Sequence, residues 1–499
     1  MPTSILFAGF PSAIVHALDP ANPDRPPAKL KAVKQLLWGD YMSVISQSQD
    51  GQLYRVKVRG VEGWIKASET QANRILEIVF VDIGQGDGAL VVTPDDKKYV
   101  IDAGQGDNMY RFLRWRFGFR KKVVFDAAIM SHSDADHYGG FDYLFDEPNA
   151  SFKTVYQNGL MERVASSATG TLGKPEKVVG DGSFITDLVE DLPGLRAFLA
   201  TPANWKKKKF PTMLEKGLSG GRFGDYRMLD VTHGHLPGHG PGAKLEIQVL
   251  GPWPEDANGK RGLRWFGDVG KTKNGHSVVL RFLYNGVKIF MGGDLNIESC
   301  RLLLEKHTGL SAKPKNAEEE AELVTAAREI FGCDVAKACH HGSADTLLPF
   351  MKSIHPIATV ISSGDDEPHA HPRADALGAI ARCSRGERPL LLSTELARSA
   401  KETIKQPSVL RQQLRDLAKK IDDATDPQKK AAAQKKFDAV VSKLERSIAI
   451  YGAINLRTDG ERVVMAYKLE RSTPSKGWDI YKLERAGEKG PLIYRSKYD

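Results

Sequence analysis

Short runs of alternating apolar and polar residues occupy the N-terminal part of the chain. They include residues 41–45, residues 53–58 and the neighbourhood of Trp64, and turns at Gly51 and Gly60 separate them. A period of two residues is typical of β-strands with one buried face. The pattern therefore predicts a small β-barrel within residues 1–72.

The hydrophobic pattern changes after residue 75. Residues 78–83 form a nearly continuous apolar run, and residues 99–103 form a second one. Runs of this kind suit strands of a sheet that is covered on both faces. Gly84, Gly86 and Gly88 follow the first run. Because neither a helix start nor the Lys-Ser/Thr pair of a P-loop comes after them, we do not expect a nucleotide-binding loop.

Between residues 406 and 447 the apolar residues recur at helical spacing in two segments. Asp426 and Pro427 stand between the segments, where they would cap and begin the second helix. Strand-like sequence resumes at residues 449–456 and continues through 463–467. We therefore expect a helical hairpin inserted into the larger domain. Its apolar positions are Leu410, Leu414, Leu417 and Ile421, followed by Phe437, Val440, Val441, Leu444 and Ile448.

The composition, with 41% apolar and 27% charged residues, is that of a globular protein. A chain of 499 residues predicts two to four domains. Since no apolar run approaches the roughly 18 residues of a membrane span, and residues 1–17 do not resemble an export signal, we expect a cytoplasmic protein without membrane association. The four cysteines contain no CxxC pair, which argues against a disulfide framework or a zinc ribbon.

The net charge of +9 favours polyanionic partners, although simple solubility explains it equally well. Basic and aromatic residues interleave at residues 111–122, and a second basic run occupies residues 205–210. The alternative is an amphipathic helix for the first run and a solvated loop for the second. On the polyanion hypothesis the residues that contact nucleic acid are Arg116, Lys206, Lys207, Lys208 and Lys209.

Ligand-type side chains are concentrated directly after a strand-like run at residues 125–130. His132, Asp134, Asp136 and His137 lie within six consecutive positions there. Imidazole and carboxylate are the ligands expected at a hydrolytic zinc or manganese site. Because the four residues follow the end of one strand, they can converge on one or two ions.

Two later strand ends carry residues of the same kind. Asp294 follows a strand-like run that begins at Ile289, and His340 and His341 follow another that begins at Asp334. Each of these positions is ambiguous by itself. Three strand ends with ligand-type residues are difficult to explain by packing, and together they predict a metal centre.

The run at residues 132–137 resembles the HxHxDH signature of the metallo-β-lactamase superfamily, with Asp134 in place of the second histidine. Further motifs follow in the order seen in the metallo-β-lactamase domain of ComEC-type competence proteins, which the chain resembles over residues 76–469. These motifs are VDIGQGD at 81–87, IDAG at 101–104, NGHSVVLR at 274–281, GD at 293–294 and HHGS at 340–343.

This resemblance implies an α/β fold, the αββα sandwich, over residues 73–470, with a C-terminal extension at 471–499. The N-terminal barrel is similar to bacterial SH3-like domains, and either a structural role or binding of a protein partner would suit it. Two features depart from the ComEC type. The sequence contains no membrane channel, so we do not expect a DNA-uptake transporter, and residues 162–261 carry no motif of the family.

The resemblance also implies a pair of divalent ions, zinc or manganese. His132 and Asp134 would hold the first ion, Asp136 and His137 would hold the second, and Asp294 would bridge them. On this assignment Asp136 also has a catalytic role, because it would orient the hydroxide that the ions activate.

His340 would be the later metal ligand. His341 would be a ligand in its place or a catalytic group that contacts the scissile bond, and His371 is a third candidate for contact with metal or substrate. Asp102 would support the ligand loop without binding metal. The third ligand of the first ion is left open among His233, His235, His239 and His276.

The leading hypothesis is a metal-dependent hydrolase, in particular a phosphodiesterase or nuclease that acts on DNA or RNA. Because the same ions can attack other electrophilic centres, a small phosphodiester, thioester or lactone is the alternative substrate. A metal-stabilised scaffold or binding protein is a third hypothesis.

Overall fold

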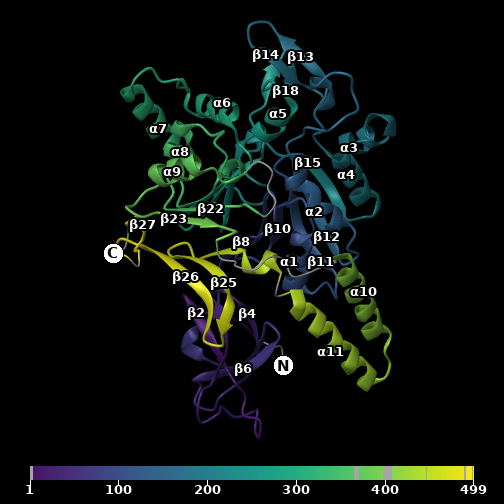
Figure 1. Cartoon of the computed structure of the whole chain (residues 1–499), viewed down its shortest axis with the longest axis vertical. Helices are drawn as coiled ribbons and strands as arrows, with labels where there is room; N and C mark the ends of the chain where they lie inside the picture. The colour runs from purple at the N-terminus through teal and green to yellow at the C-terminus, as the bar shows by residue number, and fades with distance from the viewer. Residues whose placement is uncertain are drawn as a thin grey trace.

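Two large β-sheets packed face to face form the centre of the protein (Figure 1). The computed structural model describes residues 4–364, 370–396, 407–444, 447–487, 490–496 and 498. Apolar side chains from both sheets, such as Ile78, Val91, Phe282 and Ile289, form a common core between them. Helices cover the outer faces, so the layers run helix, sheet, sheet, helix.

The first large sheet has ten strands and carries the ligand loop at its carboxyl edge. In sheet order these strands are β15 (Phe223–Met228), β12 (Ala150–Gln157), β11 (Val123–Ile129), β10 (Lys98–Ala103), β9 (Gly88–Val92), β8 (Leu76–Phe80), β24 (Ile454–Thr458), β25 (Val463–Thr473), β26 (Lys476–Arg485) and β27 (Leu492–Tyr494).

The segment after the predicted hairpin returns to this sheet. β24 pairs antiparallel with β8, with Ile454 opposite Phe80 and Thr458 opposite Leu76. β25, β26 and β27 then extend the same sheet. The boundary that we placed at residue 470 therefore falls inside β25, and most of the expected C-terminal extension continues the sheet, because Val463–Thr473 pairs along its length with Lys476–Arg485.

The second large sheet has six strands, and Asp294 and His341 follow two of its neighbouring strands. In sheet order they are β16 (Glu246–Gly251), β19 (Val279–Tyr284), β20 (Val287–Met291), β21 (Val335–Lys337), β22 (Ala358–Ile361) and β23 (Leu390–Ser393). A smaller sheet contains β13 (Pro175–Val178), β14 (Gly182–Ile185), β18 (Lys260–Arg264) and β17 (Glu255–Ala257).

Helices pack on the outer faces of both large sheets. The outer face of the ten-stranded sheet is covered by α1 (Asn108–Phe117), α2 (Ala135–Phe145), α3 (Leu192–Leu199), α4 (Lys209–Ser219) and α12 (Ile448–Tyr451). The outer face of the six-stranded sheet is covered by α6 (Ile297–Thr308), α7 (Ala317–Phe331) and α8 (Leu348–Ile354), with α9 (Ala374–Cys383) beside α8. The short helix α5 (Val269–Gly275) precedes β19.

A separate seven-stranded sheet forms the N-terminal part of the chain. Its order is β3 (Ala32–Leu37), β2 (Ser12–His16), β6 (Val61–Lys66), β5 (Leu53–Val58), β4 (Tyr41–Gln47), β1 (Ile5–Ala8) and β7 (Thr70–Gln71). The sequence pattern indicated β4, β5 and β6, but it did not indicate β1, β2 or β3. Val15, Leu36, Val56 and Ile65 form part of its own apolar core.

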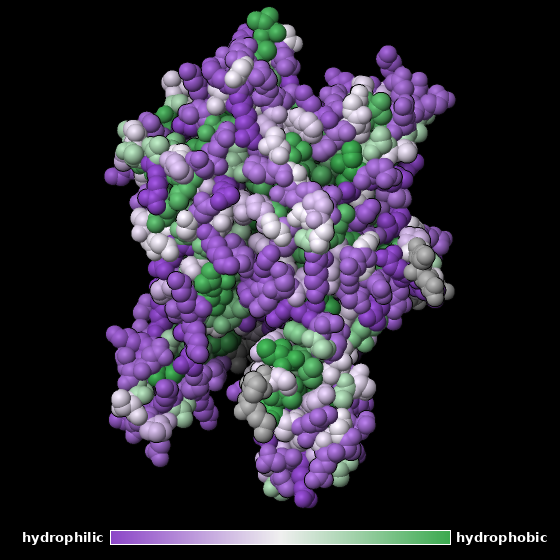
Figure 2. Space-filling view, turned by 180° about the vertical axis from the view of Figure 1, so that it is seen from behind, coloured by the Kyte–Doolittle hydropathy of each residue, from purple (hydrophilic) through white to green (hydrophobic). Residues whose placement is uncertain are grey.

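Residues 407–444 form two helices that pack on each other, α10 (Pro407–Asp423) and α11 (Pro427–Leu444). Their shared core contains Leu414, Leu417, Phe437 and Val440. Figure 2 shows that these helices and the N-terminal sheet project as separate lobes, and that hydrophobic residues gather on part of the lobe of the N-terminal sheet. The lobe of α10 and α11 therefore lies outside the two central sheets.

Candidate metal centre

The first group of ligand-type residues lies where β11 ends and α2 begins. Asp134 has an extended backbone and precedes the helix, while Asp136 and His137 lie in its first turn. Carboxylates are favoured at this position because the amino end of a helix carries partial positive charge. The loop is packed against the β8–β9 connection, since a Cβ at Gly86 would lie 1.7 Å from the Asp136 carbonyl oxygen.

Four side chains from three segments converge beside this loop. His137 Nε2 lies 3.1 Å from Asp294 Oδ2 and 3.3 Å from His341 Nε2. His341 Nε2 is 3.2 Å from Asp294 Oδ2 and 3.6 Å from Asp136 Oδ2. Atoms bound to one ion at about 2.0–2.2 Å lie about 3–3.6 Å apart, so these separations fit a shared divalent ion.

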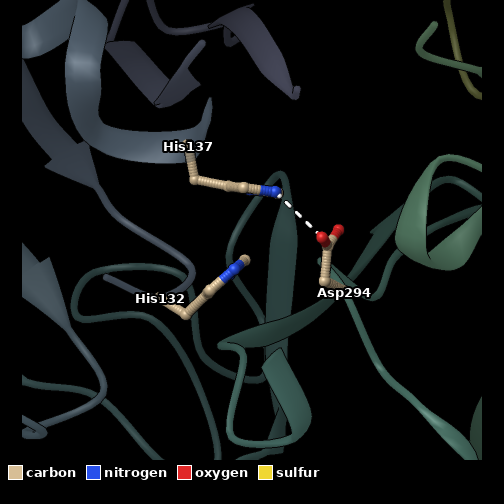
Figure 3. A group of neighbouring side chains, drawn as sticks. All are labelled: His132, His137 and Asp294. Atoms are coloured by element: carbon tan, nitrogen blue, oxygen red, sulfur yellow. Dashed lines mark ion pairs between the residues drawn. The ribbon is translucent and has the colours of Figure 1, made fainter. Parts of the chain in front are cut away.

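Figure 3 shows His132 beside this group, with its ring directed toward the space between His137 and Asp294. One ligand atom from each of these three buried residues lies within 4.8 Å of the others. His132 Nε2 is also 3.7 Å from Asp134 Oδ2. The structure therefore brings together all four ligand-type residues of the 132–137 run, together with Asp294.

Two buried carboxylates lie beside the Nδ1 atoms of His137 and His341. Asp102 Oδ2 is 2.9 Å from His137 Nδ1, and Asp102 also accepts hydrogen bonds from the backbone and hydroxyl of Ser131. Asp87 Oδ1 lies 3.1 Å from His341 Nδ1. A carboxylate on one ring nitrogen directs the other nitrogen toward a metal. Asp102 therefore supports His137 through a hydrogen bond, and Asp87 lies within ion-pair distance of His341.

The turn after β21 brings His341, not His340, to ligand distance. Both residues have left-handed backbone angles, with φ of 48° at His340 and 53° at His341. The side chain of His341 is 6% exposed, whereas that of His340 is 21% exposed and its Nε2 lies 4.0 Å from Asp294 Oδ2. His341 thus takes the position that we expected for His340. The ring of His371 lies 5.4 Å from that of His340 and 6.4 Å from that of His341.

The remaining histidines considered for the first ion lie elsewhere. His233 is held by Asp230, and His235 pairs with Glu246 at 3.0 Å. His239 Nε2 contacts the Tyr99 hydroxyl at 2.7 Å, and His276 Nε2 contacts the Arg264 carbonyl oxygen at 2.7 Å. Within the described residues, none of the four belongs to a cluster of ligand-type side chains at this centre.

The carboxylates give the centre a strong attraction for positive charge. Burial alone would raise the pKa of Asp294, but the imidazoles of His137 and His341 hold it well below its usual value. Burial alone would lower the pKa of His341, yet Asp294 and Asp87 raise it to about 9. A divalent cation would supply the positive charge that protonated imidazoles otherwise provide.

The donor set fits a divalent metal. Imidazole nitrogens and carboxylate oxygens from three strand ends converge within bonding reach of common points. Asp294 Oδ1 is buried and has no hydrogen-bond partner among the described residues, although Lys337 Nζ lies 3.8 Å away. An orphaned carboxylate oxygen of this kind is costly unless a cation is bound nearby.

Residues 82–342 match the family described as the metallo-beta-lactamase superfamily. This match covers more than half of the 499 residues. The chain belongs to this superfamily. Its members are mostly metal-dependent hydrolases and typically bind divalent metals, usually zinc. No curated protein matches the chain with significant similarity. Among the helices of the described residues, none is long and apolar enough to cross a membrane.

Several residues at the centre were not recognised from the sequence. Asp87 lies in the VDIGQGD motif, but the motif alone did not indicate contact with His341. Lys337 Nζ pairs with Asp87, and Lys273 Nζ pairs with Asp134 and, at 2.8 Å, with Glu162. The two lysines lack a local signal, because only the folded chain places their ammonium groups beside carboxylates from other segments.

Arg116 is not available to nucleic acid in the structure. Its side chain is 11% exposed, and its Nη2 lies 2.8 Å from Glu77 Oε2. The alternative that we gave for this run, an amphipathic helix with buried aromatic residues, describes α1, in which Phe112 is buried. We therefore withdraw Arg116 as a contact, because a guanidinium paired in the interior cannot reach a phosphate.

Proposed function

We propose that this chain is a metal-dependent phosphodiesterase that acts on DNA or RNA. The observation that carries the proposal is an exposed lysine run at the start of α4, the helix that packs against the ligand helix α2 through Phe210 and Tyr138. The order of motifs, which resembles that of ComEC-type competence proteins, supports the same conclusion. The net charge of +9 also favours a polyanionic substrate.

The lysine run leads into α4, whose first residue is Lys209, and α4 packs against the ligand helix α2. Lys206, Lys207 and Lys209 are exposed, and Lys208 is half-buried. The next residue, Phe210, is buried and packs edge-on against Tyr138 with 4.9 Å between ring centroids. Tyr138 directly follows His137. This contact connects the start of α4 to the ligand helix, which supports a role for the lysine run in binding phosphates of a polyanionic substrate.

The side chains of the centre have complementary roles on this proposal. Bound divalent ions would lower the pKa of a water molecule and offset charge on the departing oxygen. Asp136, 21% exposed, would accept a hydrogen bond from the attacking water and orient it. His340, exposed to the same extent, would donate to a phosphate oxygen or to the leaving group. His137 and His341 are held by Asp102 and Asp87 and would keep the ligand geometry fixed.

A hydrolysis panel tests this function. Protein loaded with manganese or with zinc would be incubated with linear DNA, plasmid, RNA, bis(4-nitrophenyl) phosphate, a thioester and a lactone. We expect cleavage of at least one nucleic acid, and we expect Asp136→Ala and Asp294→Ala to lose cleavage together with bound metal while the circular dichroism spectrum is retained. Full metal content and turnover in both variants would contradict the site assignment.

The other outcomes of the panel select between the alternatives. Hydrolysis of a small phosphodiester, thioester or lactone without cleavage of any nucleic acid would replace our proposal with a small-substrate hydrolase. The absence of hydrolysis with either metal would overturn the enzymatic proposal in favour of a metal-stabilised scaffold.

A further inference from the structure

Among the histidines that the structure describes, none supplies a third ligand to the expected first ion position. His132 Nε2 and Asp134 Oδ2 face this position, 3.7 Å apart. His132 Nδ1 lies 3.0 Å from Ser131 Oγ and 3.3 Å from Ser277 Oγ, which leaves Nε2 directed into the centre. The other oxygen of Asp134, Oδ1, is held by the ammonium group of Lys273. Each residue therefore presents one atom to the position.

The side chain of Asn274, which lies in α5, faces the same position. Its terminal amide atom that faces the centre lies 3.2 Å from His132 Nε2 and 2.7 Å from Asp134 Oδ2. With the 3.7 Å separation of those two atoms, the three form a compact triangle. Three ligand atoms at about 2.0–2.2 Å from one ion have edges of about 3–3.6 Å, which this triangle approaches.

The identity of that amide atom decides what the triangle can hold. An asparagine side chain can turn over and exchange its oxygen and nitrogen. With nitrogen inward, Asn274 would donate to His132 Nε2, Asp134 Oδ2 and the Gly270 carbonyl oxygen, and no ion is needed. With oxygen inward, the amide oxygen would face His132 Nε2, Asp134 Oδ2 and the Gly270 carbonyl oxygen, all of them acceptors, and a cation bound among them would make that arrangement favourable.

The charges around the centre favour the arrangement with a cation. The ligand groups and their ion-pair partners contribute six carboxylates and two ammonium groups. With neutral imidazoles this leaves four negative charges in a largely buried region, which a pair of divalent ions would balance. These carboxylates are Asp87, Asp102, Asp134, Asp136, Glu162 and Asp294, and the ammonium groups are those of Lys273 and Lys337.

We propose that Asn274 Oδ1 is the third protein ligand of a first divalent ion, which His132 Nε2 and Asp134 Oδ2 also bind. Asp294, within 4.8 Å of His132 and His137, would be shared with the second ion. Lys273 would keep Asp134 bound through a single oxygen. This inference rests on the metal dependence of the proposed function but not on its substrate.

Metal counting tests the proposal directly. The chelator-treated protein would be reconstituted with Mn²⁺ and examined by native mass spectrometry and by electron paramagnetic resonance. We expect a pair of ions per chain with a spin-coupled spectrum in the native protein. Asn274→Ala should retain one ion with an uncoupled spectrum, whereas Asn274→Asp, which keeps an oxygen ligand, should retain both. His235→Ala is a matched control outside the centre and should also retain both.

Metal counts and folding measurements separate this proposal from its alternatives. The thermal unfolding temperature in chelator should be the same for native protein and Asn274→Ala, and Asn274→Asp supplies the decisive comparison if Asn274→Ala does not fold. One ion per chain in the native protein, or retention of both ions with unchanged affinity in Asn274→Ala, would overturn the proposal. Bound ions in the expected numbers without hydrolysis would contradict the proposed function alone.

Discussion

At the residue scale, Lys337 beside the metal centre shows how buried charges position a ligand. Lys337, on β21, pairs with Asp87 and lies 3.8 Å from Asp294 Oδ1. Asp87 in turn lies 3.1 Å from His341 Nδ1. Burial alone would lower the pKa of Lys337, but Asp87 and Asp294 raise it. The ammonium group therefore stays charged and fixes the carboxylate that orients His341.

We expect Lys337→Met to lower the free energy of unfolding by about 3–5 kcal/mol in chelator, because it leaves a buried carboxylate without its partner. The double variant Lys337→Met with Asp87→Asn should be less destabilised than the single variant, since both charges are then removed. Urea unfolding would measure both effects. Lys288→Met on the neighbouring strand β20 is the control, with an expected change near zero. A double variant as unstable as Lys337→Met would contradict a coupled pair.

At the element scale, polar contacts attach α10 and α11 to the large domain. Their apolar core is mostly their own, with Trp115 of α1 packed against it. Arg415 donates to the Asp146 carbonyl oxygen at 2.9 Å, and Arg120 lies 3.7 Å from Asp422. The metal centre does not contact either helix among the residues described. These helices are therefore separable from the chemistry.

Deletion of residues 407–444, with a short Gly-Ser linker in their place, should leave a soluble protein with unchanged metal content. The reason is that β24, which follows the hairpin, pairs with β8, and β25 pairs with β24, both independently of the hairpin. Size-exclusion chromatography and metal analysis would check the result. Aggregation, or loss of bound metal from a folded deletion variant, would show that the helices are part of the structural unit.

The lysine run at the start of α4 is the second element with a testable role. Changing Lys206, Lys207, Lys208 and Lys209 together to alanine should weaken DNA and RNA binding and reduce the log–log salt slope by about 2–4, because fewer counterions are released. Fluorescence anisotropy across a salt series would measure the slope, and metal content should not change. A matched variant carries the same charge change on α11, at Lys429, Lys430, Lys435 and Lys436, and should retain the native slope.

The lysine prediction has a clear contrary result. If neither DNA nor RNA binds at low salt, or if both quadruple variants have the native slope, the lysine run at the start of α4 does not hold the polyanion. In the first case the nucleic-acid proposal fails as a whole, and in the second case only the assigned surface fails.

At the scale of the whole molecule, buried ion pairs connect the N-terminal sheet to the large domain. Asp40 of the N-terminal segment lies 2.7 Å from Arg59 and 3.6 Å from Arg457 of β24. Arg457 and Arg116 both pair with Glu77 of β8, at 2.6 Å and 2.8 Å. These contacts join the N-terminal sheet to the ten-stranded sheet through charged groups that are mostly buried. The protonation of these groups therefore affects the stability of the protein.

We expect the difference in stability between native protein and Asp40→Asn to depend on pH. Burial alone would raise its pKa, but Arg59, Arg457 and Arg116 lower it to about 2. The unfolded carboxyl has an ordinary pKa of 3.8, so the ionised folded form stabilises the protein above about pH 4, and this contribution is lost as the pH falls toward 2. Asp40→Asn should therefore cost about 2 kcal/mol near neutral pH and progressively less below pH 4.

Thermal or urea unfolding from pH 7 to pH 2 would measure this difference. Asp423→Asn, which changes an exposed carboxylate on α10, should show a small difference that does not vary with pH. If the free energies of unfolding of native protein and Asp40→Asn differ by the same amount at every pH, the ion pairs of Asp40 do not stabilise the contact between the N-terminal sheet and the large domain.

Features that depend on neighbours in the chain could be predicted from the sequence. His132, Asp134, Asp136 and His137 lie within six positions after an apolar strand, so local geometry alone keeps them together. The helices at 407–444 follow from apolar spacing, and β4, β5 and β6 follow from alternation. The short strands β1, β2 and β3 could not be predicted in the same way, because their pairing partners, rather than their own pattern, make them strands.

Features that depend on contacts between distant segments were decided only by the tertiary structure. The choice of His341 over His340 arises from a left-handed turn, which the repeated histidines do not reveal. Arg116 looks like a surface cation in sequence, yet Glu77, distant in the chain, pairs with it in the interior. Asn274 reaches the centre because α5 packs beside the ligand loop. Chain proximity determines which groups are available, and long-range packing determines which atoms meet.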